Sequence, residues 1–199
     1  VSLREEVEMI KMAKEEGMDI SCEVSCHHLF LTDQDVKRLG SYGMMRPPLS
    51  KKEDQDALWQ GLLDGAIDMI ASDHAPHTRE EKENSEKVVN GVPGLETSLP
   101  LLLTAANEGR ITLEKVIEIT STNPRRIFNL PEQNSEVEVD LEEKYMIDSK
   151  NLFTKCGWTP FEGLSVKGKV KRVVLRGKIV YEDGKVSVPF GKIIFPQIL

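Results

Sequence analysis

Residues 67–77 read Ile-Asp-Met-Ile-Ala-Ser-Asp-His-Ala-Pro-His, and this stretch decides the fold. Its first five residues form a compact, mostly apolar run of the kind found in buried parallel strands. The ionisable residues Asp73, His74 and His77 follow at once. In α/β folds, catalytic and binding groups gather at the carboxyl ends of parallel strands. The stretch therefore predicts a strand that ends in a chemical site.

Helices and strands alternate around this stretch. Residues 3–16 and 51–64 carry apolar side chains at helical spacing, and residues 19–24 read as a short strand. This alternation is typical of a parallel sheet or barrel, so the predicted fold class is α/β. The remaining expectations are helices at 32–40, 95–107, 113–119 and 123–128, an extended or irregular segment at 27–31, and a charged loop at 78–94.

The pattern changes after about residue 135. Residues 137–141 alternate with a period of two, and residues 170–175 and 178–181 are rich in β-branched side chains. Asp183-Gly184 is a hairpin-turn pair. We therefore expect two domains, an α/β domain over residues 1–134 and a small β-sandwich-like domain over residues 135–199.

The composition excludes several classes of protein. The chain has 199 residues, a formal net charge of -7, and 39% hydrophobic residues. An acidic chain lacks the basic face that nucleic acids and anionic membranes require, so neither is an expected partner. Its three cysteines are too few for a disulfide framework and indicate a reducing compartment. No apolar run reaches the roughly 20 residues of a membrane span.

The sharpest candidate site contains Asp73 and His77. A carboxylate and an imidazole at a strand end can bind a metal, act as a base, or hold an anionic substrate. A solvated loop with an aspartate cap is an equally good interpretation, because zinc needs four ligands. A second cluster, Cys22, Cys26 and His27-His28, favours a structural role, since free cysteines are usually small buried groups.

Three other segments leave their alternatives open or favour an ordinary role. Arg46 could hold an anion, but a loop arginine is more often simply exposed. Residues 91–97 are either a lid hinge or a turn before a helix. Residues 158–163 place Trp and Phe around a proline, which favours packing between domains. The sequence contains no serine elbow, P-loop or dinucleotide-binding motif.

Seven motifs in a fixed order carry a family resemblance. They are Cys-Glu-Val at 22–24, His-His-Leu-Phe-Leu at 27–31, Arg-Pro-Pro-Leu at 46–49, Ala-Ser-Asp-His-Ala-Pro-His-Thr at 71–78, Gly-Leu-Glu-Thr at 94–97, Asn-Pro-Arg-Arg-Ile-Phe at 123–128 and Trp-Thr-Pro-Phe-Glu-Gly at 158–163. The chain resembles the dihydroorotases, cyclic amidohydrolases of pyrimidine synthesis. It is most similar to the dihydroorotase domain of the animal trifunctional CAD protein.

The resemblance implies a fold and a position within it. The family fold is a (β/α)8 barrel with a small β domain and a binuclear zinc centre. Residues 1–134 would then be the C-terminal part of the amidohydrolase barrel, followed by the β-rich domain. The His-x-His pair, the carboxylated lysine and two histidines that bind zinc in the family are not in this sequence. We therefore expect the 199-residue chain alone to be inactive.

The resemblance also assigns roles to single residues. Asp73 matches the family's zinc-binding aspartate, which acts as general base and then as general acid. Glu23 matches a carboxylate that helps to hold an extra zinc in the animal domain. His77 matches the histidine that binds the substrate carboxylate. Arg46 lies where backbone groups meet the pyrimidine ring.

Two further residues, Asn90 and Gly91, fall near the segment that touches the carboxylate side of the substrate. The implied reaction is reversible hydrolysis of dihydroorotate to N-carbamoyl-L-aspartate in pyrimidine biosynthesis, in the cytoplasm. A homodimer and fusion to other pyrimidine-pathway enzymes both agree with the family. The alternatives are a related hydantoinase or allantoinase, and a non-catalytic dihydroorotase-like scaffold domain.

Overall fold

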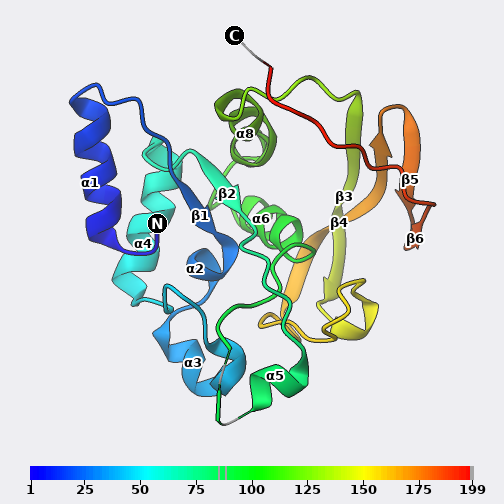
Figure 1. The fold of residues 1–199 in the computed structure, drawn as a ribbon, viewed down its shortest axis with the longest axis horizontal. Helices are drawn as coiled ribbons and strands as arrows, with labels where there is room; N and C mark the ends of the chain where they lie inside the picture. Colours follow the sequence, from blue (N-terminus) through cyan, green and yellow to red (C-terminus); the bar gives the residue numbers. More distant parts are fainter. Residues whose placement is uncertain (85, 88, 198–199) are drawn as a thin grey trace.

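A computed structural model describes residues 1–84, 86–87 and 89–197. Helices α1 (Arg4–Glu15) and α4 (Lys52–Asp64) pack side by side next to the first strands (Figure 1). Leu58 and Leu62 of α4 are fully buried, and Val7 of α1 packs over Gly61. Both helices confirm the periodicity of the sequence, which places an apolar stripe on one face of each.

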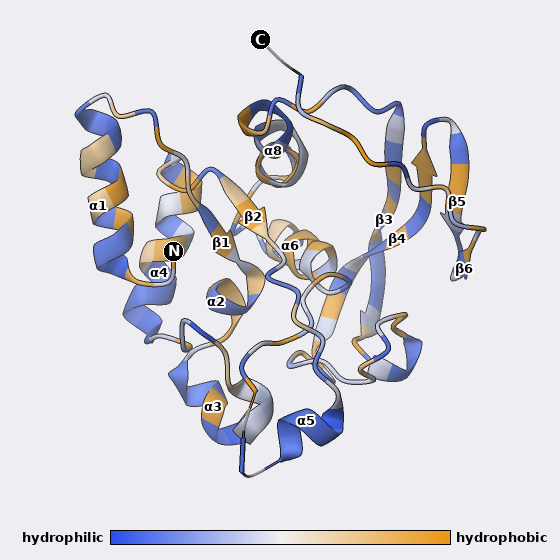
Figure 2. Ribbon diagram, in the orientation of Figure 1, coloured by the Kyte–Doolittle hydropathy of each residue, from blue (hydrophilic) through white to orange (hydrophobic). Residues whose placement is uncertain are grey.

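The two central strands are parallel. Strand β1 (Glu23–Ser25) pairs with β2 (Met69–Ala71), and Ser25 lies opposite Ala71. Figure 2 shows β2 as a hydrophobic segment, as the sequence predicted. Because the strands are parallel, the segments that follow Ser25 and Ala71 leave the sheet at the same edge.

Two predictions about the segments beyond this edge are wrong. Residues 27–31 were expected to be extended or irregular, but α2 (Cys26–Phe30) is a helix whose first four residues are buried. A helical turn satisfies backbone groups that have no access to water there. Residues 78–94 were expected to be a loop, but α5 (Arg79–Glu83) lies within them. Thr78 caps this helix, and residues 85 and 88 of the expected loop lie outside the described residues.

Short helices complete the α/β part. The bounds are α3 (Asp33–Leu39), the 3-10 helix η1 (Gly40–Gly43), α6 (Ser98–Asn107), α7 (Leu113–Ile117), the π-helix η2 (Glu118–Thr122) and α8 (Asn123–Ile127). Helix α6 lies between the parallel strands and the second sheet in Figure 1. It starts three residues later than predicted, after a turn in which the Gly94 carbonyl accepts from the Ser98 amide.

The second sheet is antiparallel, with strand order β3-β4-β5-β6. The bounds are β3 (Ser135–Met146), the 3-10 helix η3 (Ser149–Asn151), β4 (Ser165–Leu175), β5 (Lys178–Glu182) and β6 (Lys185–Val186). Asp183 and Gly184 have φ values of 43° and 82°, which confirms the predicted hairpin turn. Helix α6 covers β4, where a side chain at Gly168 would lie 2.6 Å from Cβ of Leu103.

One apolar core connects the two sheets. It includes Leu58 of α4, Leu102 of α6 and Val166 of β4, together with Trp158 and Phe161 from the segment before β4. Within the part of the chain that the structure describes, no helix combines the length and apolar character needed to cross a membrane.

Candidate active site

Asp73 stands at the carboxyl end of the parallel strands. It follows β2 with a φ of 42°, an uncommon backbone conformation for a residue other than glycine. Its side chain is 57% exposed, and Oδ2 lies 3.6 Å from Nε2 of His27. That same nitrogen lies 2.8 Å from Oγ of Ser25. The parallel register of β1 and β2 brings these three side chains to one edge.

The two histidines of α2 are buried and neutral at pH 7. Burial lowers the pKa of His27 to about 4 and the pKa of His28 to about 4. Their rings lie 4.5 Å apart, and both ring nitrogens of His28 have no hydrogen-bond partner among the described residues. The imidazole of His27 that faces the Asp73 carboxylate is therefore uncharged. It can interact with that carboxylate through its dipole but not as a positive charge.

His74 has a structural role at the strand end. Its Nδ1 accepts hydrogen bonds from the amides of Gly94 and Leu95, each at 3.2 Å. Since Nδ1 accepts two donors, its proton resides on Nε2. The Gly94 turn fits closely, because a Cβ at this residue would lie 2.4 Å from the carbonyl oxygen of Ser72. His74 thus fastens the turn to the segment after β2.

His77 is held through its backbone. The indole Nε1 of Trp158 donates to the His77 carbonyl at 2.7 Å, so this hydrogen bond does not use the imidazole. The His77 side chain is 33% exposed, and its Nδ1 lies 3.6 Å from Oε2 of Glu81. Trp158 and Phe161 are buried in the apolar core, as expected for a packing segment, and their expected place between two domains stays a prediction. The Trp158 side chain also fixes a candidate binding residue.

The loops that carry the other candidates meet at the same edge. The Gly91 amide donates to the Met44 carbonyl at 2.9 Å, and the Ala75 amide donates to the Val92 carbonyl at 3.0 Å. Arg46 is exposed two residues after Met44, and Asn90 is half-buried next to Gly91. The structure therefore brings the segments of Arg46, Asn90, Gly91 and His77 together beside Asp73.

Glu23 lies at the other end of the strand pair. Glu23 is the first residue of β1 and pairs with Met69, which precedes Asp73 by four residues. Its side chain is exposed. Among the residues that the structure describes, no group of three or more His, Cys, Asp or Glu side chains could hold a metal ion. A zinc ion takes four ligands, and Asp73 offers one. These residues alone do not fit a complete zinc site.

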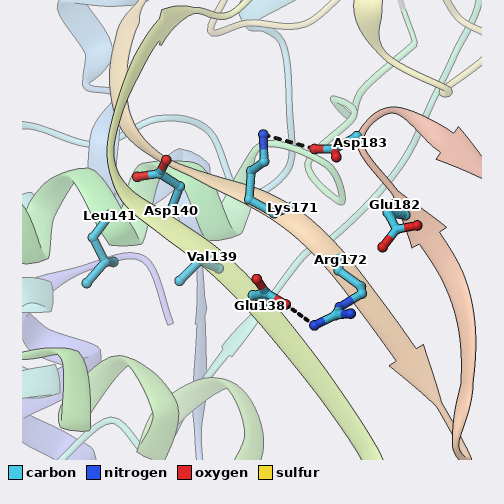
Figure 3. Close-up of a pocket in the computed structure, with 8 residues that line it drawn as sticks. All are labelled: Glu138, Val139, Asp140, Leu141, Lys171, Arg172, Glu182 and Asp183. Atoms are coloured by element: carbon cyan, nitrogen blue, oxygen red, sulfur yellow. Dashed lines mark hydrogen bonds and ion pairs between the residues drawn. The ribbon is translucent and has the colours of Figure 1, made fainter.

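One surface hollow lies away from these residues. It has a volume of about 650 Å³ and opens on the antiparallel sheet. Figure 3 shows that charged side chains of both signs line it, with Lys171 paired to Asp183 and Arg172 paired to Glu138. Four acidic and two basic side chains line the hollow, and no candidate site residue contributes to it. The strand edge at Asp73 remains the candidate site.

Comparison of the sequence with family profiles identifies the family to which the chain belongs. A profile of the amidohydrolase family matches residues 3–180 of the chain. The chain belongs to the amidohydrolase family. Members of this family are generally metal-dependent. The α/β fold is that of the C-terminal part of a (β/α)8 amidohydrolase barrel followed by a β-rich segment.

Curated relatives cover nearly all of this amidohydrolase chain. The multifunctional protein pyr1-3 of Dictyostelium discoideum is 55% identical over 96% of the chain, which spans 8% of that protein. The multifunctional protein CAD of Squalus acanthias is 52% identical over 96% of the chain and 8% of its own length. The dihydroorotase of Bacillus pumilus is 41% identical over 93% of the chain and 45% of its own length. The chain thus spans less than half of each of these relatives.

Solved structures include enzymes of another substrate class. The L-hydantoinase of Arthrobacter aurescens matches 98% of the chain and 47% of its own, with a TM-score of 0.93 and 34% identity. An inactive dihydroorotase-like domain of a Chaetomium thermophilum CAD-like multifunctional protein matches 95% of the chain and 52% of its own, with a TM-score of 0.76 and 29% identity.

Sequence reasoning missed residues that surround the site. Ser25 came to notice only through its hydrogen bond to His27, and His27, which the sequence placed in a structural cluster, lies 3.6 Å from the Asp73 carboxylate. Lys82, which is fully buried, lies in a run of charged residues typical of a solvated helix. The structural interpretation of the cysteine cluster is supported at Cys26, where burial raises the pKa of the thiol to about 11. A thiol with this pKa is protonated and inert at pH 7.

Proposed function

We propose that this amidohydrolase chain is part of a dihydroorotase, which reversibly hydrolyses dihydroorotate to N-carbamoyl-L-aspartate. The observation that carries the proposal is its 55% and 52% identity to two multifunctional proteins and its 41% identity to a bacterial dihydroorotase. Identity to the solved L-hydantoinase is lower, at 34%. The exposed Asp73 carboxylate supports the proposal, because ring opening of a cyclic amide needs a group that moves protons.

Asp73 is the proposed proton carrier. As water attacks the ring carbonyl, the Asp73 carboxylate takes one of the water protons. The ring C–N bond then breaks, and the Asp73 carboxylic acid returns that proton to the leaving nitrogen. The ring-closing direction reverses both transfers. Its exposure on one side and the neutral His27 on the other leave the carboxylate free to act in both directions.

The remaining candidates would hold the substrate. His77, Asn90 and Gly91 are proposed to bind the substrate carboxylate, and Arg46 is proposed to lie at the pyrimidine ring. Backbone hydrogen bonds from Gly91 to Met44 and from Ala75 to Val92 join the segments of these residues to the segment after β2, which supports a shared pocket. A substrate with a carboxylate suits this set, since an imidazole and an arginine favour an anion.

The remaining proposals follow from the resemblance. The complete enzyme would contain a binuclear zinc centre to which Asp73 contributes, and Glu23 as a ligand of an extra zinc stays a prediction. Residues 1–134 and 135–199 are proposed as its two domains. Fusion to other pyrimidine-pathway enzymes, a homodimer and a cytoplasmic location are part of the same proposal, and the multifunctional relatives support the fusion.

A substitution at Asp73 tests the proposal in the longer enzyme. Asp73→Asn keeps the size of the side chain and removes the proton acceptor, so we expect dihydroorotate hydrolysis to fall by about 10²–10⁴-fold. Asp19→Asn is the matched control, since Asp19 is exposed and precedes β1 at the far end of the strand pair. Retention of full activity in Asp73→Asn would refute the proposed role.

A substrate comparison separates the alternatives. The longer enzyme is assayed with dihydroorotate, hydantoin and allantoin under the same conditions. Preference for dihydroorotate supports the proposal, and preference for hydantoin or allantoin replaces it with the related amidohydrolase. Absence of turnover with all three, in a folded and metal-loaded protein, indicates a scaffold domain like the inactive solved relative.

A further inference from the structure

Lys82 is the only lysine among the fully buried large side chains of the described residues, with 0% of its surface exposed. Its ammonium donates to three carbonyl oxygens, those of Met44, Val89 and Gly91, at 3.0, 2.9 and 3.1 Å. Burial lowers the pKa of Lys82 to about 8, so the ammonium is still mostly protonated at pH 7. A buried charge is costly unless hydrogen bonds satisfy it, and here three acceptors match the three N–H donors.

The three carbonyls belong to the loops that carry the candidate substrate ligands. Met44 lies two residues before Arg46, and Val89 and Gly91 flank Asn90. The Met44 carbonyl also accepts from the Gly91 amide at 2.9 Å. Lys82 therefore connects its own helix, α5, to two loops. These two loops are more than forty residues apart in sequence.

Aromatic and charged side chains enclose the same point. Trp158 lies under the ammonium, with 5.6 Å from Nζ to the ring centroid, and its indole holds the His77 carbonyl. Tyr42 packs edge-on against Trp158 at 4.8 Å and donates from its hydroxyl to Glu83 of α5. Arg79 of α5 lies over the Tyr42 ring. The Lys82 side chain and Trp158 thus fix the segments of Arg46, Asn90–Gly91 and His77 as one unit.

We propose that Lys82 is a positioning residue, which holds the two loops and His77 in the arrangement that binds substrate. The identity of the substrate rests on the proposed function. The arrangement of the loops rests only on the hydrogen bonds of Lys82. Lys82 touches no reacting atom. Its loss is expected to weaken binding of the substrate rather than the proton transfers at Asp73.

The kinetic experiment uses Lys82→Met in the longer enzyme. Methionine fills much of the same space but donates no hydrogen bond, so the loops lose their common anchor. We expect KM for dihydroorotate to rise about tenfold or more with kcat changed less than about threefold. Lys82→Gln, which keeps two N–H donors on a shorter side chain, should give a smaller rise. Lys87→Met, an exposed lysine in the same loop, is the matched control.

A second measurement uses the longer enzyme and needs no substrate. Hydrogen exchange at the Gly91 amide, which donates to Met44, should be about tenfold faster in Lys82→Met and unchanged in Lys87→Met. Unchanged exchange and unchanged KM in a folded Lys82→Met variant would overturn the proposal. So would unfolding of both Lys82 variants, because the role would then be global stability. If the wild-type enzyme lacks dihydroorotate turnover, the proposed function fails while the exchange result still decides the role of Lys82.

Discussion

Single residues at the strand edge differ sharply in their access to water. Asp73 is exposed and His77 is half-buried, whereas His27 and His28, behind Asp73, are buried. A buried imidazole resists protonation because the charged form loses its hydration. These two histidines therefore link the stability of the site to pH.

Acid should destabilise the chain through the buried histidines. Burial lowers the pKa of His28 from 6.5 to about 4, so between these pH values the unfolded chain binds more protons than the folded one. The stability that depends on a neutral His28 is fully present above about pH 6.5 and is lost as the pH falls toward 4. His28→Phe removes the titrating group, so urea unfolding at pH 7.5 and pH 4.5 should show about 2–3 kcal/mol less acid loss than in the wild type.

The wild-type chain is the reference at both pH values. The substitution changes no carboxylate, so the difference in acid loss between the two proteins reports on His28. Phenylalanine also replaces two ring nitrogens that have no partner among the described residues. We therefore expect no loss of stability at pH 7.5. An acid loss as large in His28→Phe as in the wild type would show that His28 is protonated without cost.

Candidate site residues could be predicted from the sequence where they directly follow a recognisable strand. Asp73 and His77 stood out because they follow an apolar strand. Lys82 gave no signal, since Arg-Glu-Glu-Lys-Glu at residues 79–83 has the composition of a solvated helix. Its burial depends on carbonyls from segments that only the folded chain brings together.

At the level of elements, the turn at Gly94 joins the parallel strands to α6. Its amide and that of Leu95 bind His74, and its carbonyl accepts from the Ser98 amide and hydroxyl at the start of α6. The Ser72 carbonyl approaches so closely that only a residue without Cβ fits. Residues 91–97 were left open between a lid hinge and a turn before a helix, and the structure shows the hydrogen bonds of a turn at Gly94.

Gly94→Ala should destabilise the chain. The added Cβ would lie 2.4 Å from the Ser72 oxygen, so the backbone must shift. We expect a loss of about 1–3 kcal/mol in the free energy of unfolding, measured by urea titration. Gly191→Ala is the matched control, because its Cβ would meet nothing within 4 Å. Equal stability of the two variants would show that the turn relaxes without cost.

Element types were predicted better than their positions. The helices α1 and α4 and the antiparallel hairpin follow directly from hydrophobic periodicity and an Asp-Gly turn. Helix α2 was missed because burial of four consecutive residues removes the amphipathic pattern. Helix α5 was missed because a single capped turn of five residues is too short to show a period.

For the whole molecule, the parallel sheet is small. Strands β1 and β2 pair with each other in a two-stranded sheet within the described part of the chain. Parallel sheets are normally buried on both faces and contain more strands. On α1, Met9 and Met12 are 69% and 61% exposed. These features agree with a chain that spans less than half of its dihydroorotase relative.

The whole-molecule prediction concerns activity of the chain by itself. We expect no dihydroorotate hydrolysis by the purified 199-residue chain with added zinc, since Asp73 alone cannot complete a four-ligand site. The longer enzyme, assayed at the same concentration, should turn the substrate over. Circular dichroism of the chain is the control, because inactivity is informative only if the helices are formed. Substantial turnover by the chain alone would show that Asp73 and the loops held by Lys82 are sufficient for the reaction when zinc is supplied, and it would contradict the expectation.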